Sequence, residues 1–116
     1  MKLYGIPNCD TVKKARAWLD EHGVAYEFHD YKKQGVDRAM LQSWLEQQPW
    51  EKLVNRAGMT WRGLDDAEKS TVTDNTGAIA LMMAKPSVIK RPILAENGRI
   101  LAVGFAPAAY TVVAVR

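Results

Sequence analysis

One cysteine, two histidines and the absence of any long apolar run exclude several classes of protein. A single cysteine, Cys9, cannot form an internal disulfide, so the chain is not a disulfide-stapled secreted scaffold. Neither His22 nor His29 completes a metal-ligand set with one cysteine, so we expect no bound metal. No apolar segment approaches the roughly 20 residues that span a bilayer, and Gly5 and Pro7 interrupt the start before a signal-peptide core forms. These shortages predict a cytoplasmic protein with no membrane partner.

The charge balance shows no pronounced excess of either sign. Lys and Arg number 16 against 13 Asp and Glu, which gives a net charge of +3. The basic residues are spread along the chain and not gathered in a tail, as in a solvated mixed surface, so we expect no nucleic-acid partner. A mildly basic field would still assist the approach of an anionic substrate. The length fits one compact domain, which we expect to span residues 1–116.

The first third of the chain shows a strand, a helix and a second strand. The segment Lys2–Ile6 is short, apolar and β-prone. A helical pattern begins at Asp10 or Thr11, and Gly23 is placed to terminate it. Alternating polarity over residues 24–31 then predicts a half-buried strand. A crossover of this length should place the two strands parallel.

The middle of the chain is helical, and we expect residues 37–84 to form a helical insertion and not a second domain, because so short a segment would hardly hold its own core. Its elements are a helix capped by Asp37 and limited by Pro49, a helical stretch over Trp50–Val54, a loop opened by Ala57-Gly58, a short turn over Asp65–Lys69, and a helix capped by Thr73 or Asp74 that stops before Pro86.

The last third returns to strands. The segments Pro92–Glu96 and Arg99–Val103 are β-prone, and Asn97-Gly98 between them is a strong two-residue hairpin signal. A closing helix is predicted from Pro107 to about Val115. The complete order predicts an α/β protein with a four-stranded mixed sheet, which is the thioredoxin-like plan.

Cys9 follows the first strand and precedes the first turn of the first helix. In open α/β sheets, functional sites lie at such carboxyl ends of strands. Free N–H groups and the helix dipole at this end stabilise a negative charge and lower the pKa of a thiol. Lys13 adds a positive charge one turn on, and Thr11 offers a hydroxyl. A buried structural cysteine is the alternative, but the polar flanks Asn8 and Asp10 argue against it. We therefore predict a reactive thiolate.

Val12 stands where a second thiol of a Cys-x-x-Cys motif would be. An adduct on Cys9 must therefore be resolved by an external thiol, most simply glutathione acting as co-substrate. The sequence predicts no tightly bound cofactor.

A second group of candidate residues surrounds Arg91-Pro92. A proline that opens a strand suits a rigid turn, and the sequence leaves open whether its peptide bond is cis. Arg91 would offer a planar fork to a carboxylate or oxyanion, although a surface Lys-Arg pair beside an edge proline is about as common. Arg56 and Arg62 are further cation candidates, each more often a solvated surface residue.

Two runs carry a resemblance to a known family: PNCDTVKKA over residues 7–15 and IKRPI over residues 89–93. Together, in this order, they resemble the ArsC/Spx family of thioredoxin-like proteins, and the first run looks most like its YffB branch. The resemblance implies a glutathione-dependent thiol reductase of ArsC-type fold with Cys9 as nucleophile, Arg91 preceding a cis-proline and Thr11 in the anion-binding loop. The residues expected to bind glutathione or the substrate are Asn8, Asp10, Thr11, Lys13, Arg56 and Pro92.

The sequence departs from the family pattern at two places, and these departures bear on two alternative functions, arsenate reduction and Spx-like regulation. Arsenate reductases of the family use two further arginines; Arg56 falls near one, but residues 102–105 read AVGF where the other should lie. This weakens the alternative of an arsenate reductase coupled to glutathione and glutaredoxin. Spx regulators carry a Cys-x-x-Cys switch, which Val12 rules out, although a non-enzymatic module that binds RNA polymerase remains an alternative.

Overall fold

The computed structural model describes residues 1–114. Its elements, in chain order, are β1 (Lys2–Gly5), α1 (Asp10–Glu21), β2 (Glu27–Asp30), α2 (Tyr31–Gln34), α3 (Arg38–Gln47), α4 (Trp50–Leu53), α5 (Met59–Arg62), α6 (Asp66–Ser70), α7 (Asn75–Ala84), the 3₁₀-helix η1 (Pro86–Val88), β3 (Ile93–Glu96), β4 (Arg99–Val103) and α8 (Pro107–Ala114).

The four strands form one mixed sheet in the order β2-β1-β3-β4. β1 runs parallel to β2, with Lys2 opposite Glu27, and antiparallel to β3, with Tyr4 opposite Ile93. β3 and β4 are antiparallel, and a register irregularity lies between Leu94 and Ala95. The α/β class and the four-stranded mixed sheet predicted from the sequence are confirmed.

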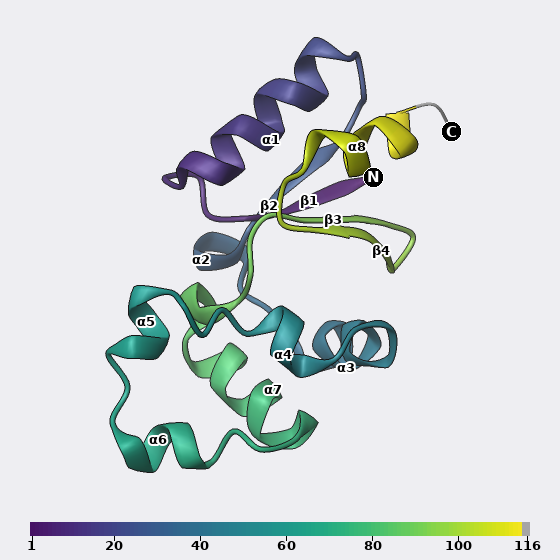
Figure 1. The fold of residues 1–116 in the computed structure, drawn as a ribbon. Helices are drawn as coiled ribbons and strands as arrows, with labels where there is room; N and C mark the ends of the chain where they lie inside the picture. The colour runs from purple at the N-terminus through teal and green to yellow at the C-terminus, as the bar shows by residue number, and fades with distance from the viewer. Residues whose placement is uncertain (115–116) are drawn as a thin grey trace.

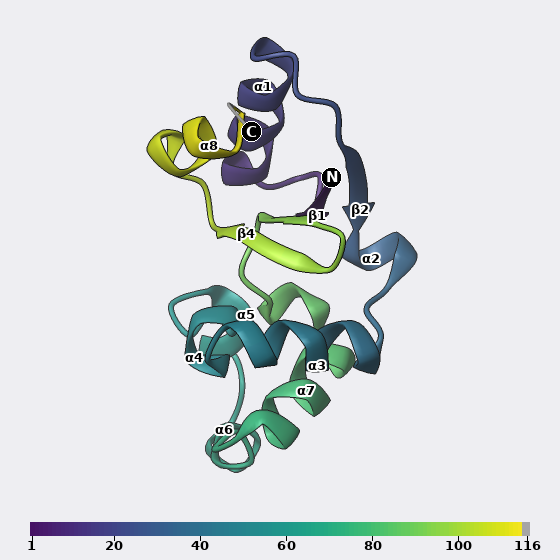
Figure 2. The same ribbon diagram turned by 90° about the vertical axis from the view of Figure 1, so that its right-hand side faces the viewer.

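Side chains that alternate along the central strands divide the core between the two faces of the sheet. Leu3 of β1 and Leu94 of β3 pack with residues of α1 and α8 on one face. Tyr4 and Ile93, their neighbours along the chain, pack with the helical insertion on the other. The ring of Trp44 in α3 meets Tyr4 edge-on, with ring centroids 4.9 Å apart. Figures 1 and 2 show the resulting layers, with α1 and α8 on one side of the sheet and α3 to α7 on the other.

The helix ends follow the capping signals in the sequence. Asp37 accepts a hydrogen bond from the N–H of Met40, and Asp74 accepts one from Gly77, so both begin helices as predicted. Asp65 forms a reciprocal capping box with Glu68 at the start of α6. At the hairpin, Asn97 and Gly98 have φ of +53° and +81°, the left-handed values that such a tight turn requires.

The second strand is shorter than predicted, and this prediction was wrong at both ends. β1 has only four residues, and they pair with Glu27–Asp30; residues 24–26 therefore lie opposite no residue of β1, and β2 begins at Glu27. At the other end, the Asp30 side chain accepts hydrogen bonds from the N–H groups of Lys32 and Lys33 and starts α2. Tyr31, expected in the strand, therefore belongs to a helix.

Two further elements were not expected. α5 lies where a loop was predicted, and η1 follows α7 with Pro86 in its first turn. The predicted end of the last helix at Val115 lies outside the described residues. Within residues 1–114, no helix combines the length and the apolar character needed to cross a membrane.

Candidate active site

Cys9 occupies the N-cap position of α1, directly after the turn that leaves β1. The turn is tight because Gly5 has no side chain: a β-carbon there would lie 2.9 Å from Cγ2 of Val12 and 3.8 Å from the β-carbon of Arg91. Gly5 thus lets the end of β1, the first turn of α1 and the segment before β3 meet at one point. The Cys9 side chain is partly exposed there.

Opposing influences act on the Cys9 thiol. Burial raises its pKa, but interactions with the backbone N–H of Val12, the Arg91 side chain and the backbone N–H of Thr11, together with the positive charge of Arg91, outweigh burial. The net effect holds the pKa of the Cys9 thiol below its ordinary value. The Cys9 side chain makes no capping hydrogen bond to the described first turn of α1, and the attraction of the N–H groups there for the sulfur is strongest when the sulfur is charged.

Arg91 reaches the same point from the start of β3. Tyr4 pairs with Ile93, so the preceding residues Arg91 and Pro92 lie beside the end of β1. The peptide bond between Arg91 and Pro92 is cis. Nη1 of Arg91 donates to the backbone carbonyl of Ser87 at 2.7 Å and, at 3.5 Å, to that of Ile89. Its buried Nε has no hydrogen-bond partner among residues 1–114.

The other predicted site residues of the first run lie around Cys9 in different ways. Asn8, Asp10, Thr11 and Lys13 are exposed at the turn and the first turn of α1. Thr11 acts on Cys9 through its backbone N–H, whereas its hydroxyl was expected to do so. Lys13 is not among the groups that lower the Cys9 pKa; in the structure, the cation with that effect is Arg91.

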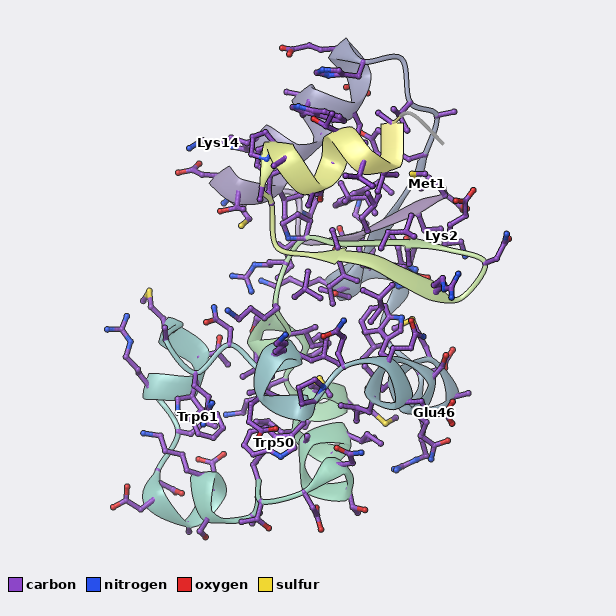
Figure 3. All side chains as sticks on the ribbon, turned by 45° about the vertical axis from the view of Figure 1, so that its right-hand side comes forward. Met1, Lys2, Lys14, Glu46, Trp50 and Trp61 are labelled. Carbon is purple, nitrogen blue, oxygen red and sulfur yellow. The ribbon has the colours of Figure 1, made fainter. Side chains whose placement is uncertain are left out.

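Pro92 and Arg56 have different surroundings. Pro92 is buried, and its carbonyl accepts a hydrogen bond from the N–H of Gly104 at 2.7 Å. Arg56 is exposed, and its guanidinium carbon lies 5.3 Å from the ring centroid of Trp50. Figure 3 shows Trp50 and Trp61 within the helical insertion. The contact between Arg56 and Trp50 therefore lies inside the insertion to which both residues belong.

Sequence reasoning missed the role of Ser87. It contributes a backbone carbonyl to Arg91, and a carbonyl contact leaves no trace in residue identity. The amide of Val12 is one of the free N–H groups that the sequence predicted at this end of the helix, although the sequence did not single out its residue.

The arrangement supplies one nucleophile, N–H donors that stabilise its anion, and one guanidinium. That set suits attack of a thiolate on an electrophilic sulfur or a small oxyanion. Residues 1–114 hold no group of three or more His, Cys, Asp and Glu side chains placed to bind a metal ion.

Comparison with known proteins identifies close relatives. The sequence model of the ArsC family matches residues 4–113. The solved structure of the YFFB protein is 55% identical, with a TM-score of 0.90 and 96% of each chain covered. An arsenate reductase (ArsC) related protein from Brucella melitensis is 51% identical, with a TM-score of 0.76, covering 96% of this chain and 91% of that one. The global transcriptional regulator Spx of Streptococcus pyogenes is 30% identical, covering 89% of this chain and 76% of that protein.

Proposed function

The chain belongs to the ArsC family, and on that premise we propose that it is a glutathione-dependent thiol-disulfide oxidoreductase with Cys9 as its one nucleophile. The observation that carries the proposal is the lowered pKa of Cys9 beside Arg91, in a chain whose only cysteine is Cys9. A thiolate without a second thiol can form a mixed disulfide but cannot resolve it alone.

The reaction consists of two exchanges. The Cys9 thiolate attacks the glutathione sulfur of a glutathionylated substrate; the Cys9–glutathione disulfide forms, the substrate disulfide breaks, and the substrate leaves as a thiolate that takes up a proton. The thiolate of a second glutathione then attacks the glutathione sulfur of the mixed disulfide, releasing oxidised glutathione and the Cys9 thiolate. In sum, one substrate disulfide is reduced by two electrons, and oxidised glutathione carries the oxidised sulfurs away.

Arg91 and the amides of Thr11 and Val12 have two tasks in this scheme. They stabilise the Cys9 thiolate before attack and after its release, which makes Cys9 a good leaving group in the second exchange. Arg91, with Arg56 assisting, would also hold the carboxylates of glutathione. Asn8, Asp10, Lys13 and Pro92 would line the same site. Because the second exchange consumes reduced glutathione, we place the protein in a reducing cytoplasm.

Mass spectrometry and a turnover assay test the proposal. The protein incubated with oxidised glutathione should gain one glutathione on Cys9, and Cys9→Ser should gain none. A glutathionylated peptide, reduced glutathione, glutathione reductase and NADPH should then give NADPH consumption that depends on Cys9. An ordinary thiol pKa together with no adduct would overturn the proposal.

Arsenate reduction coupled to glutathione and glutaredoxin is the second candidate, because a 51% identical relative is described as related to arsenate reductase. The hydrogen bond from Gly104 to Pro92 places residues 102–105 next to the Arg91 turn, and they contribute no cation there. We therefore expect arsenate turnover far below turnover of the glutathionylated peptide in the same assay; comparable rates would favour arsenate.

The relation to Spx supports a third candidate, a binding module for a transcription protein such as RNA polymerase. Such binding would not need the thiol. A pull-down of RNA polymerase with the wild type and with Cys9→Ser separates the two ideas: equal capture by both, with no glutathione adduct, would favour the module.

A further inference from the structure

Within the described part of the chain, Arg91 is held by backbone carbonyls and not by a carboxylate. Its Nη1 donates to Ser87 at 2.7 Å and to Ile89 at 3.5 Å, and the ion pair found within residues 1–114, between Lys85 and Glu68, does not involve it. Neutral carbonyls fix the direction of a guanidinium without cancelling its charge, whereas a carboxylate would offset much of the field that reaches Cys9. The 3₁₀-helix η1 therefore supplies, through Ser87, the shorter of the two hydrogen bonds that direct the Arg91 side chain.

Backbone contacts hold the segment after Ser87 to the helical insertion. Val54 and Ile89 form an isolated antiparallel bridge. Around it, the N–H of Asn55 donates to the carbonyl of Val88 at 2.8 Å, and the N–H of Lys90 donates to that of Leu53 at 2.7 Å. These bonds place residues 88–90 beside the end of α4.

The Ser87 side chain has a hydrogen-bond partner in α5. The Thr60 hydroxyl donates to the Ser87 hydroxyl at 3.2 Å, between residues 27 positions apart, and both side chains are partly buried. α5 and η1 also pack against each other. The Thr60 hydroxyl therefore contacts the residue whose carbonyl accepts the hydrogen bond from Arg91.

We propose that Thr60 is a positioning residue that, by holding Ser87, fixes the Arg91 guanidinium next to Cys9; this inference rests on the proposed function, in which Cys9 is the nucleophile. The helical insertion supplies no group that acts on the sulfur directly. It would then affect the pKa of the Cys9 thiol through Thr60, Ser87 and Arg91 in turn. The expected sign follows from the charge: a displaced Arg91 stabilises the thiolate less, so the pKa of Cys9 rises.

The first experiment measures the rate of Cys9 alkylation by iodoacetamide against pH. Thr60→Val keeps the shape of the side chain and removes the hydroxyl, and we expect the pKa of Cys9 to rise by roughly 0.3 or more, about a twofold loss of thiolate below the pKa. Thr60→Ser keeps the hydroxyl and should retain the wild-type profile. Ser87→Ala removes the acceptor and should reproduce the shift, which keeps the test valid if Thr60→Val folds poorly. Unchanged profiles in Thr60→Val and Ser87→Ala would overturn the proposal.

The second experiment tests whether the effect passes through Arg91. In an Arg91→Ala background, Thr60→Val should leave the alkylation pKa of Cys9 unchanged, because the group it orients is gone. A shift of equal size in both backgrounds would mean that Thr60 acts by another route and would also overturn the proposal. Alkylation needs no glutathione, so a protein that fails the glutathione adduct assay can still pass these tests, and the two failures are distinguishable.

Discussion

Gly5 and Val12 pack so closely that a β-carbon on Gly5 would lie 2.9 Å from Cγ2 of Val12. Val12 is fully buried, and its backbone N–H is among the groups that lower the Cys9 pKa. The end of β1 therefore sets the position of the first turn of α1, and with it the donors that face the sulfur. The missing side chain of Gly5 thus allows the packing that places the Val12 N–H near the sulfur, where it lowers the pKa of Cys9.

We predict that Gly5→Ala destabilises the protein and raises the Cys9 pKa together. The new methyl group must displace Val12, a stiff β-branched side chain that is fully buried, and overpacking of this kind costs about 1–3 kcal/mol. Displacement of the Val12 amide would move the pKa of Cys9 towards its ordinary value. Urea denaturation measures the first effect, and the pH dependence of Cys9 alkylation measures the second.

Gly35→Ala is the matched control for this substitution. Gly35 has φ of +70° and ψ of −173°, a conformation almost confined to glycine, and a β-carbon there would meet no atom of residues 1–114 within 4 Å. The substitution should therefore cost a similar ~1–3 kcal/mol through the backbone alone. It should leave the Cys9 pKa unchanged. A Gly5→Ala protein with a wild-type alkylation profile would contradict the link between Gly5 and the thiol.

Removal of the guanidinium should raise the Cys9 pKa. Arg91 lowers this pKa both by hydrogen bonding and by its charge, so Arg91→Ala loses both effects, whereas Arg91→Lys keeps the charge and loses the planar fork. We expect the alkylation pKa of Cys9 to increase in the order wild type, Arg91→Lys, Arg91→Ala.

Lys13→Ala provides the comparison for Arg91, because it removes the same charge from the first turn of α1. Lys13 is exposed and is not among the groups that lower the Cys9 pKa, so its loss should leave the alkylation profile close to wild type. A larger rise of the Cys9 pKa in Lys13→Ala than in Arg91→Ala would contradict this and would support the sequence-based prediction that Lys13 is the cation acting on Cys9.

The lowered pKa of Cys9 also makes stability depend on pH in a defined direction. Since the folded protein stabilises the thiolate, ionised Cys9 favours the folded state, and its contribution is complete above the pKa of the unfolded chain. The contribution is lost as the pH falls through the folded pKa. The free energy of unfolding of wild type minus that of Cys9→Ser should therefore increase between about pH 5 and about pH 9.5, a range that includes the ordinary thiol pKa.

Denaturant titrations of both proteins across this range check the sign. Other titrating groups are shared by wild type and Cys9→Ser, so their effects cancel in the difference. A difference that is constant with pH, or that falls as the pH rises, would show that the fold does not stabilise the thiolate.

Local chemistry explains which parts of this fold could be predicted. Asp37 and Asp74 cap the helices assigned to them, and Asn97-Gly98 makes the expected turn, because each signal is complete within a few residues. The end of β2 was missed because its length depends on β1, to which it pairs, and because Asp30 starts α2 with its side chain. The length of a strand therefore depends on the strand beside it, which can be distant in the sequence.

The candidate site divides in the same way. Cys9 could be found from its place after the first strand, and the pKa shift has the predicted direction. The cation beside it could not be chosen by proximity in sequence: Lys13 is four positions away and Arg91 is 82 positions away, yet Arg91 is the one that lowers the pKa. The carbonyl of Ser87 has no sequence signal at all, because every residue type carries one.

Gln47 gives a last prediction, on how the helical insertion protects the sheet. At the end of α3, its Nε2 donates to the carbonyl of Gly98 at 2.9 Å, and its Oε1 accepts from the N–H of Ile100 at 2.7 Å. β4 is an edge strand, so one side-chain amide here takes the place of a neighbouring strand. We expect Gln47→Ala to lower the free energy of unfolding by about 1 kcal/mol through the loss of these exposed bonds.

Removal of the amide should also speed hydrogen exchange at Ile100 and increase aggregation, because an unpaired edge can accept another chain. Gln42→Ala, an exposed glutamine of the same helix, is the matched control and should change the urea midpoint little. Gln47→Glu should fall between the two, since it keeps the acceptor for Ile100 and loses the donor to Gly98. Equal midpoints for Gln47→Ala and Gln42→Ala would mean that water replaces the amide at this edge without loss, and that Gln47 does not stabilise β4.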